Sequence, residues 1–136
     1  MIQQTPLTDE DYQTLATFRH ALRRFYHFSE NAAEAKGLTP QQHQALLAIR
    51  SAMDEGMTIG RLAEQLMLRP HSATGLVDRL AIAGLVERLP NPADKRQVLL
   101  RLTPDASAVL EGLSIAHRDE IRRMRPMLLN LLDQLA

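Results

Sequence analysis

Small or polar residues and a pair of cations stand close together in the middle of the chain. The first group lies within residues 69–81 and consists of His71, Ser72, Thr74, Gly75 and Asp78. The cations, Lys95 and Arg96, follow a short distance along the chain. Hydroxyl and imidazole groups donate and accept hydrogen bonds, whereas Lys and Arg neutralise anions. This combination indicates recognition of a polar, anionic partner rather than the making or breaking of bonds.

Catalytic motifs find little support in the sequence. His71 and Ser72 are neighbours, but successive residues of a helix point about 100° apart and do not form a nucleophile–base pair. The sequence also lacks a G-x-S-x-G elbow, a phosphate-binding loop and a dinucleotide fingerprint. We therefore expect no enzymatic activity.

The histidines do not form a recognisable metal motif. They are His20, His27, His43, His71 and His117. His20 and His27 lie seven residues apart, so one helix face would carry both, and Glu30 is the acid near them in the sequence. No H-x-x-x-H or H-E-x-x-H pair occurs. We predict neither a metal nor a cofactor, and expect satisfied or solvent-exposed histidines.

A helix over residues 69–83 must position the polar residues. Its apolar residues recur at i, i+3, i+4 and i+7, the spacing of one helix face. They are Ala73, Leu76, Val77 and Leu80. Pro70 suits the first helical turn, and Gly84 suits the position after the last turn, where φ is positive.

Two short β-type runs, Leu85–Leu89 and Gln97–Leu102, follow that helix, and the turn-rich loop 90–96 between them ends in the two cations. A short helix over Ile59–Met67 precedes it after a tight connection, which predicts a helix-turn-helix. Helix and hairpin together predict a winged helix. Such a helix suits the major groove of DNA, and the wing suits the neighbouring backbone or minor groove.

Helix-start signals divide the rest of the chain. Thr-initiated caps predict helices over residues 8–36 and 39–52, and a third helical region over 104–136. Within that region Pro126 either kinks the helix or begins a new one over Met127–Leu135. We predict one mainly α domain with a small β-hairpin wing, its winged helix-turn-helix spanning about 39–103.

The two terminal helical regions carry apolar stripes. The first holds every Phe and Tyr of the chain, between Tyr12 and Phe28, interleaved with Arg19, Arg23 and Arg24. One interpretation is a partly buried amphipathic helix with a solvated basic face; the other is a dimer interface, where aromatic and Arg residues concentrate. The last region is rich in Leu and Met, and we expect a partner chain to cover it.

Composition narrows the class of protein. The 136 residues suffice for one domain, and with 45% apolar residues the chain is not expected to be disordered. The absence of cysteine excludes disulfides and thiolate sites. No membrane span or signal segment is visible, which favours a cytoplasmic location. The net charge is zero, but residues 56–103 carry seven basic and four acidic residues, an excess of +3 where phosphate contact would need it.

At these segments the chain resembles a known family. Asp94–Thr103 (DKRQVLLRLT) resembles the wing signature D-x-R-x-x-x-L-x-L-T of the multiple-antibiotic-resistance-regulator (MarR) type of transcription factor. Leu76–Leu80 (LVDRL) and Gly84–Arg88 (GLVER) are similar to that family's recognition helix and first wing strand. The resemblance extends across nearly the whole chain but becomes mere helical pattern at both ends.

The resemblance implies roles for single residues. The Arg of the family that matches Arg96 enters or borders the minor groove, and the acid that matches Asp94 helps to hold it. His71, Ser72 and Thr74 would face base edges.

Five further residues complete the expected DNA-binding set: Arg69, Pro70, Gly75, Lys95 and Arg79, of which Arg79 would meet a phosphate or pair with Asp78. Gly75 stands where relatives often carry a larger polar or basic residue, and Arg69 where a capping Ser is common. A base preference is therefore not transferred from the family.

The resemblance also implies a ligand site. In the family, aromatic acids or phenols bind where the dimerisation helices meet the winged-helix lobe. The polar residues expected there are Arg19, Arg23, Tyr26 and His43, beside Phe25 and Leu46. An Arg with a His suits a carboxylate or phenolate. Alternatively, Arg19 and Arg23 are merely solvated and His43 packs near Leu38.

These observations predict a homodimeric winged-helix repressor that binds a pseudo-palindromic operator in double-stranded DNA and releases it on binding a small ligand. One alternative is a winged helix that serves as a protein-interaction module. Another is a metal-responsive regulator, because some members of the resembled family bind zinc through His and Glu.

Overall fold

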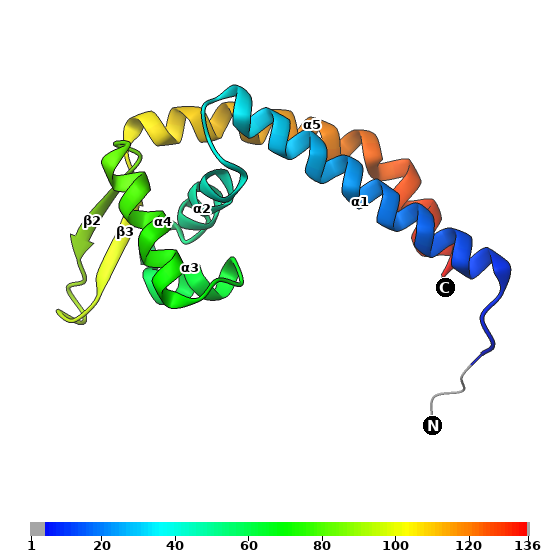
Figure 1. Cartoon of the computed structure of the whole chain (residues 1–136), viewed down its shortest axis with the longest axis horizontal. Coiled ribbons are helices and arrows are strands. Elements are labelled where there is room, and N and C mark those ends of the chain that lie inside the picture. Colours follow the sequence, from blue (N-terminus) through cyan, green and yellow to red (C-terminus); the bar gives the residue numbers. More distant parts are fainter. Residues whose placement is uncertain (1–4, 136) are drawn as a thin grey trace.

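The structure is a computed structural model that describes residues 5–135. Ala136, the last residue of the expected terminal helix, and the first four residues lie outside the described residues. A winged lobe sits at one end of two long helices that run side by side (Figure 1). The elements in chain order are α1 (Asp9–Ala35), α2 (Pro40–Ser51), the 3-10 turn η1 (Met53–Glu55), β1 (Met57–Thr58), α3 (Ile59–Gln65), α4 (Pro70–Ile82), β2 (Val86–Pro90), β3 (Val98–Leu102) and α5 (Pro104–Gln134).

The helices begin where the sequence predicted, and threonine caps explain why. The side chains of Thr8, Thr39, Thr58 and Thr103 each accept a hydrogen bond from a backbone N–H in the first turn of α1, α2, α3 and α5. The helix α4 is different, because its N-cap residue Arg69 makes no capping hydrogen bond. Its first-turn N–H groups therefore lack a side-chain partner at the N-cap.

The lobe contains the densest part of the core. The helices α2, α3 and α4 pack with a three-stranded antiparallel sheet in the order β1-β3-β2. The largest fully buried side chains all belong to the lobe: Leu46, Met57, Leu62, Leu76, Val77, Leu80 and Leu100. The four predicted apolar positions of α4 are all buried, which confirms the helical period read from the sequence.

The sheet differs from the predicted hairpin in two details. The strand β1 was not predicted, because its two residues, Met57 and Thr58, are too few to show a period-two pattern. They pair with Leu100 and Leu99 of β3. The strand β2 lies one residue later than predicted and includes Pro90, which is tolerated because β2 is an edge strand.

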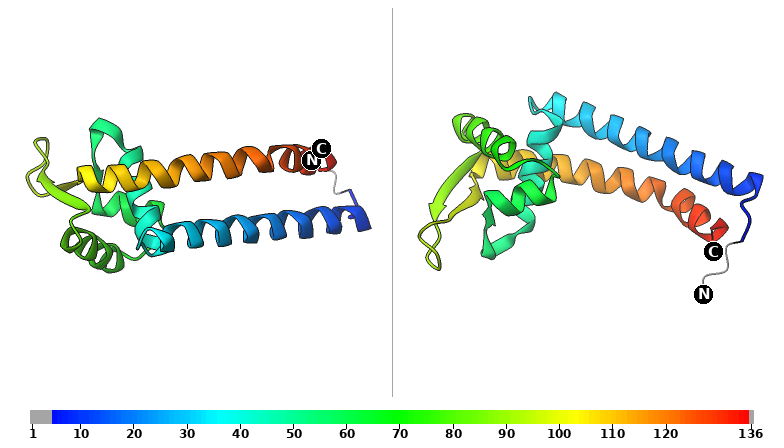
Figure 2. Two further views of the ribbon diagram at one scale, coloured as in Figure 1. Left: turned by 90° about the horizontal axis from the view of Figure 1, so that it is seen from above. Right: turned by 60° about the horizontal axis from the view of Figure 1, so that its bottom comes forward.

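The helices α1 and α5 form an antiparallel hairpin whose free ends lie together, far from the wing (Figure 2). The hydroxyl of Thr14 donates to Oε1 of Gln134 at 3.0 Å and fastens the far end. The side chains that α1 buries, Thr14, Ala21 and Ala33, are small. Of its larger apolar side chains, Tyr12 is 60% exposed, whereas Phe25 and Phe28 are half-buried. The first half of the apolar stripe predicted for α1 is therefore uncovered in a single chain.

The helix α5 runs without interruption past Pro126. The alternative of a separate helix over Met127–Leu135 is therefore wrong. Proline removes one N–H and displaces the carbonyl four residues earlier, but Pro126 lies on an exposed face where water can solvate that carbonyl. Across residues 5–135, none of the helices combines the length and apolar character needed to cross a membrane.

Candidate functional site

The exposed face of α4 gathers the polar residues singled out in the sequence. The side chains of Arg69, Pro70, His71, Ser72, Thr74 and Arg79 are exposed, and Gly75 is half-buried. The hydroxyl of Thr74 donates to the carbonyl of Pro70 at 3.1 Å, which fixes its orientation on the first turn. The apolar face of α4 is anchored in the core, so this polar face is held outward.

Gly75 and Arg79 lie one helical turn apart on that face. A Cβ added at Gly75 would lie 3.5 Å from Nη1 of Arg79. The guanidinium of Arg79 therefore extends back over Gly75, as side chains four residues apart do on a helix. A larger residue at position 75 would contact this guanidinium and redirect it.

The loop at the wing tip is organised by Asp94. Its carboxylate accepts hydrogen bonds from the backbone N–H of Arg96 at 3.0 Å and from Nε of Arg96 at 3.1 Å. Hydrogen bonding to the Arg96 side chain, and then to its backbone, lowers the pKa of Asp94. The Arg96 side chain is nevertheless 90% exposed. The pair that the family resemblance implied is present, and it presents a fixed cation beside the exposed Lys95.

A second ion pair joins α4 to the wing. Asp78 of α4 binds Arg88 of β2, and both side chains are partly exposed. The pairing of Arg79 with Asp78 expected from the sequence is therefore corrected: adjacent helical residues diverge, whereas β2 brings Arg88 over Asp78. This bond fixes the wing relative to the exposed face of α4.

A cleft of about 390 Å³ lies where α1, α2 and α5 meet. We call it the junction cleft. His43 lines it together with His117, and its cations are Arg118 and Arg122 of α5. Phe25 lines it from α1. Of the four polar ligand residues expected from the sequence, only His43 is brought to this cleft.

The other three expected ligand residues, Arg19, Arg23 and Tyr26, lie on the exposed face of α1. No pattern in the sequence pointed to Arg118 and Arg122, because the register in which α5 lies against α1 is set by tertiary packing.

Two histidines stack in the wall of the junction cleft. The rings of His43 and His117 have centroids 4.8 Å apart. Nδ1 of His117 donates to the carbonyl of Leu113 at 2.6 Å, and its Nε2 lies 2.8 Å from the hydroxyl of Ser29. His43 is buried, and its Nδ1 has no hydrogen-bond partner among the residues that the structure describes. Burial, and secondarily the neighbouring His117, lowers the pKa of His43.

The remaining histidines do not assemble a metal site. His20 and His27 are both exposed on α1. Within residues 5–135, no group of three or more His, Cys, Asp and Glu side chains is placed to hold a metal ion.

A helix-turn-helix followed by a two-stranded wing, mounted on a long helical hairpin, defines a winged-helix protein. The MarR family model matches residues 36–97. The multiple antibiotic resistance protein MarR of Salmonella typhimurium is 42% identical over 74 residues, which are 54% of this chain and 50% of that protein. The HTH-type transcriptional regulator ML2140 of Mycobacterium leprae is 30% identical over 112 residues, covering 71% of this chain and 78% of that protein. The chain belongs to the MarR family.

A solved relative supports the fold over nearly the full length. A mutant MarR from E. coli in complex with operator DNA has a TM-score of 0.67 and 26% identity, covering 96% of this chain and 99% of that one. The chain nevertheless spans about half the length of the MarR proteins it matches in sequence.

Proposed function

We propose that the protein is a homodimeric transcriptional repressor that binds double-stranded DNA and is released by a small organic anion. One observation carries the DNA-binding part: the exposed polar face of α4 lies beside a wing whose Arg96 is held by Asp94. Both groups project from a rigid lobe. A fixed helix and a fixed cation are what recognition of two adjacent grooves requires.

The residues divide into base-reading and phosphate-binding groups. His71, Ser72 and Thr74 would face base edges in the major groove. The uncapped first turn of α4, after Arg69, offers backbone N–H groups to a phosphate, favoured by the helix dipole. Arg79 and Lys95 would contact phosphates on either side, while Arg96 reaches the minor groove.

The uncovered apolar surface of the hairpin supports a dimer. Exposed large apolar side chains lie along α1 and α5, with Leu132 65% exposed and Phe18 42% exposed. A two-fold axis would bury both stripes and place two copies of α4 about one DNA turn apart. Arg19, Arg23 and Tyr26 also suit this interface, because Arg and Tyr are enriched in such contacts.

The junction cleft is our proposed effector site. It combines apolar walls with His43, Arg118 and Arg122, and no acidic side chain lines it among the described residues. That lining suits an aromatic acid. The cleft lies between the dimerisation hairpin and α2 of the lobe, so an occupant would alter the spacing of the two recognition helices. A tenfold loss of DNA affinity requires only about 1.4 kcal/mol of coupling.

Selection from random double-stranded DNA tests this proposal most directly. We expect an approximate palindrome with half-sites one helical turn apart. Affinity for the selected sequence should fall steeply between 50 and 200 mM salt, about 0.9 log units per log unit of salt for each phosphate neutralised. Selection without enrichment, or a flat salt response, would contradict DNA binding and favour a protein-interaction module instead.

A further inference from the structure

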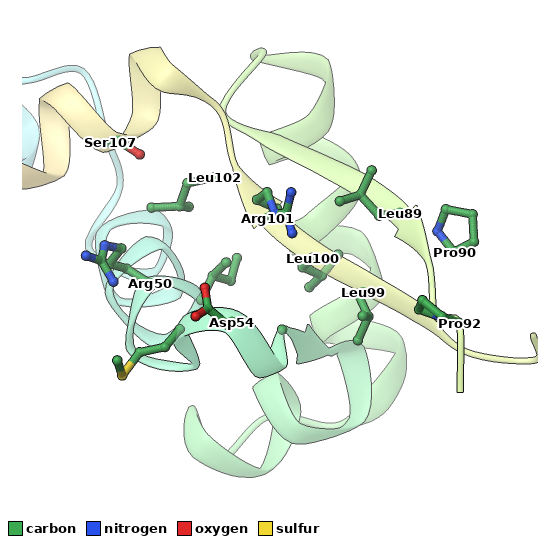
Figure 3. A pocket seen from close by; sticks show the side chains of 13 residues that line it. Arg50, Asp54, Leu89, Pro90, Pro92, Leu99, Leu100, Arg101, Leu102 and Ser107 are labelled. Carbon is green, nitrogen blue, oxygen red and sulfur yellow. The ribbon is translucent and has the colours of Figure 1, made fainter. Parts of the chain in front are cut away.

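A wide cleft lies on the wing, on the sheet face that points away from α4. Its volume is about 810 Å³. We call it the outer-face groove. Figure 3 shows the wing strands on one side and the end of α2 with η1 on the other, with Arg50, Asp54, Leu99 and Arg101 around the opening. None of these residues belongs to the exposed face of α4 or to the junction cleft.

The floor of the outer-face groove is apolar and rigid. Leu89 and Leu99 are directly opposed across the β2–β3 ladder, so their side chains share one face of the sheet. Pro90 and Pro92 form the rim towards the wing tip and restrict the backbone there. Met53, 74% exposed, lines the opposite wall. An exposed, unbranched Met beside two paired Leu side chains offers a surface that adapts to an apolar group.

Unusual backbone conformations build the wall that faces the wing. Met53 has a φ of 56°, in the left-handed region that a side chain of this kind rarely adopts. Gly56 has a φ of 77°, and a Cβ there would approach Leu99 to 3.1 Å. A side chain at position 56 would be strained at this φ and would crowd Leu99, so glycine suits the close crossing of the chain over Leu99. Two residues in strained or glycine-dependent conformations border the same cleft, and such conformations concentrate at ligand sites.

Two cations line the outer-face groove, Arg50 from α2 and Arg101 from β3. Within residues 5–135, neither Arg50 nor Arg101 forms an ion pair. Glu87 stands opposite Arg101 in the ladder, yet Arg101 lines the groove instead of pairing with it. Asp54 is the one acidic group among the lining residues, so two cations and one anion leave the lining with a charge of +1.

We propose that the outer-face groove binds a small organic carboxylate with a flat apolar body. Guanidinium groups bind carboxylates through paired, charge-assisted hydrogen bonds, which Arg50 and Arg101 offer from opposite walls. The body of the ligand lies on Leu89 and Leu99, and Asp54 accepts a hydrogen bond from a hydroxyl or amino substituent. The position of this groove makes it distinct from the effector site proposed for the junction cleft.

Occupancy of the outer-face groove acts on the wing directly. Leu89 and Leu99 belong to the two strands that carry Asp94 and Arg96 at their tip. A ligand that bridges these strands to the end of α2 fixes the angle of the wing against the lobe. This route needs neither the dimer interface nor the junction cleft.

A fluorinated probe, 4-(trifluoromethyl)benzoate, tests the site by ¹⁹F NMR line broadening on the full chain. The neutral alcohol 4-(trifluoromethyl)benzyl alcohol is the matched control ligand. We expect the benzoate to bind at least tenfold more tightly than the alcohol. Amide shifts of Gly56, Leu99 and Arg101 should move on titration. Equal binding of both probes, or unmoved amides at these three residues, overturns the proposal.

Paired variants separate this groove from the junction cleft. The double substitution Arg50→Gln and Arg101→Gln should weaken benzoate binding at the wing amides at least tenfold. The double substitution Arg118→Gln and Arg122→Gln should leave those amides responding normally. All four side chains are exposed, so both proteins should melt like the parent chain.

The opposite pattern would be a loss of the benzoate response at the wing amides only in the variant with Arg118→Gln and Arg122→Gln. That result would contradict binding in the outer-face groove and support the junction cleft. A loss of operator affinity in the ligand-free variant with Arg50→Gln and Arg101→Gln would assign these cations to phosphates instead, and would also overturn the proposal. Failure of the junction cleft to bind any anion would leave the wing result standing, because the two readouts concern different amides.

Discussion

The lobe and the hairpin solve the burial of apolar surface in opposite ways. In the lobe, side chains such as Leu62, Leu80 and Leu100 are at most 2% exposed. In the hairpin, the fully buried side chains of α1 are small, and residues as large as Tyr12 and Leu132 are left more than half exposed. The lobe therefore closes on itself, while the hairpin presents an unfinished interface.

This difference indicates that the lobe stabilises the single chain and that the hairpin is the candidate interface. A self-contained core gives α4 and the wing a fixed geometry whether or not a second chain is present. The hairpin contributes less to the fold of one chain, and in the proposed dimer it would hold the two chains together. Substitutions in the lobe should therefore change unfolding, and those on the hairpin should change the oligomeric state.

The largest effect should come from the core of the lobe. Leu80→Ala removes a fully buried side chain of α4 and should lower the free energy of unfolding by about 2–5 kcal/mol. Ile82→Ala on the same helix is the control, because Ile82 is 88% exposed and should cost little. Urea unfolding followed by circular dichroism measures both. Equal effects of the two substitutions would contradict a self-contained lobe.

A charge on the hairpin should act on assembly. Leu132→Asp should abolish the burial of this side chain in each protomer of the proposed dimer, a loss of about 1.5–3 kcal/mol per protomer. Sedimentation should show a shift towards monomer at micromolar concentration, with the circular dichroism of the lobe unchanged. A parent chain that is already monomeric, or a variant dimer of unchanged stability, would argue against this interface.

Removing the cation at the wing tip should affect DNA affinity alone. Arg96→Ala should weaken binding to the selected operator by about 1–3 kcal/mol and lower the salt dependence, with the melting temperature unchanged. Arg125→Ala, an exposed cation on α5, removes the same charge far from the wing and should leave affinity nearly constant. Unchanged operator affinity in folded Arg96→Ala protein would refute the wing contact.

The link between the two regions depends on Thr103. Its hydroxyl donates to the carbonyl of Gly84 at 2.7 Å and accepts from the N–H of Ala106 at 3.2 Å. Thr103→Val keeps the shape but loses both bonds, and should destabilise the chain by about 0.5–2 kcal/mol. Thr103→Ser should restore most of the loss in thermal unfolding. If Ser fails to do so, the methyl group rather than the hydroxyl is what matters.

The smallest effect concerns pH at the seam between lobe and hairpin. Burial and His117 lower the pKa of His43, so the folded state favours the neutral ring. The unfolded chain, with an ordinary value of about 6.5, then binds protons that the folded chain refuses. Stability is complete above that value and falls as pH decreases below it. Melting temperatures between pH 7.5 and 5.5 should show this decline, and His43→Phe should flatten it.

Local signals explain why most of the fold was predictable. Thr caps, Pro at first turns and the i, i+3, i+4, i+7 spacing in α4 act between residues close in sequence, and the structure follows them within one or two residues. The strand β1 was not predicted because it forms only through its pairing with β3. The alternative of a new helix after Pro126 was wrong because an exposed proline can be accommodated within a long helix.

The residues of the candidate site also divide into those that local sequence predicts and those that tertiary packing places. The polar face of α4 was predicted from the helical spacing, and the Asp94–Arg96 pair was implied by the family resemblance. The Asp78–Arg88 bond, the His43–His117 stack and the place of Arg118 and Arg122 in the junction cleft depend on how distant elements pack. Sequence pattern alone carries no register for such contacts.

The bond between Thr14 and Gln134 joins residues 120 positions apart. The core of the lobe, by contrast, is built mainly from one continuous stretch between α2 and β3, together with Ala33 of α1 and with Ala106, Leu110 and Leu113 near the start of α5. During synthesis from the N-terminus the lobe can fold once the start of α5 has been made, while the rest of α5 is still incomplete, because most of its contacts are local and closing short loops costs little entropy. The apolar side of α1 then remains uncovered until α5 of the same chain is complete. If the proposed dimer forms, two ribosomes on one message would hold two uncovered α1 helices near each other, which would favour pairing between nascent chains before either hairpin closes.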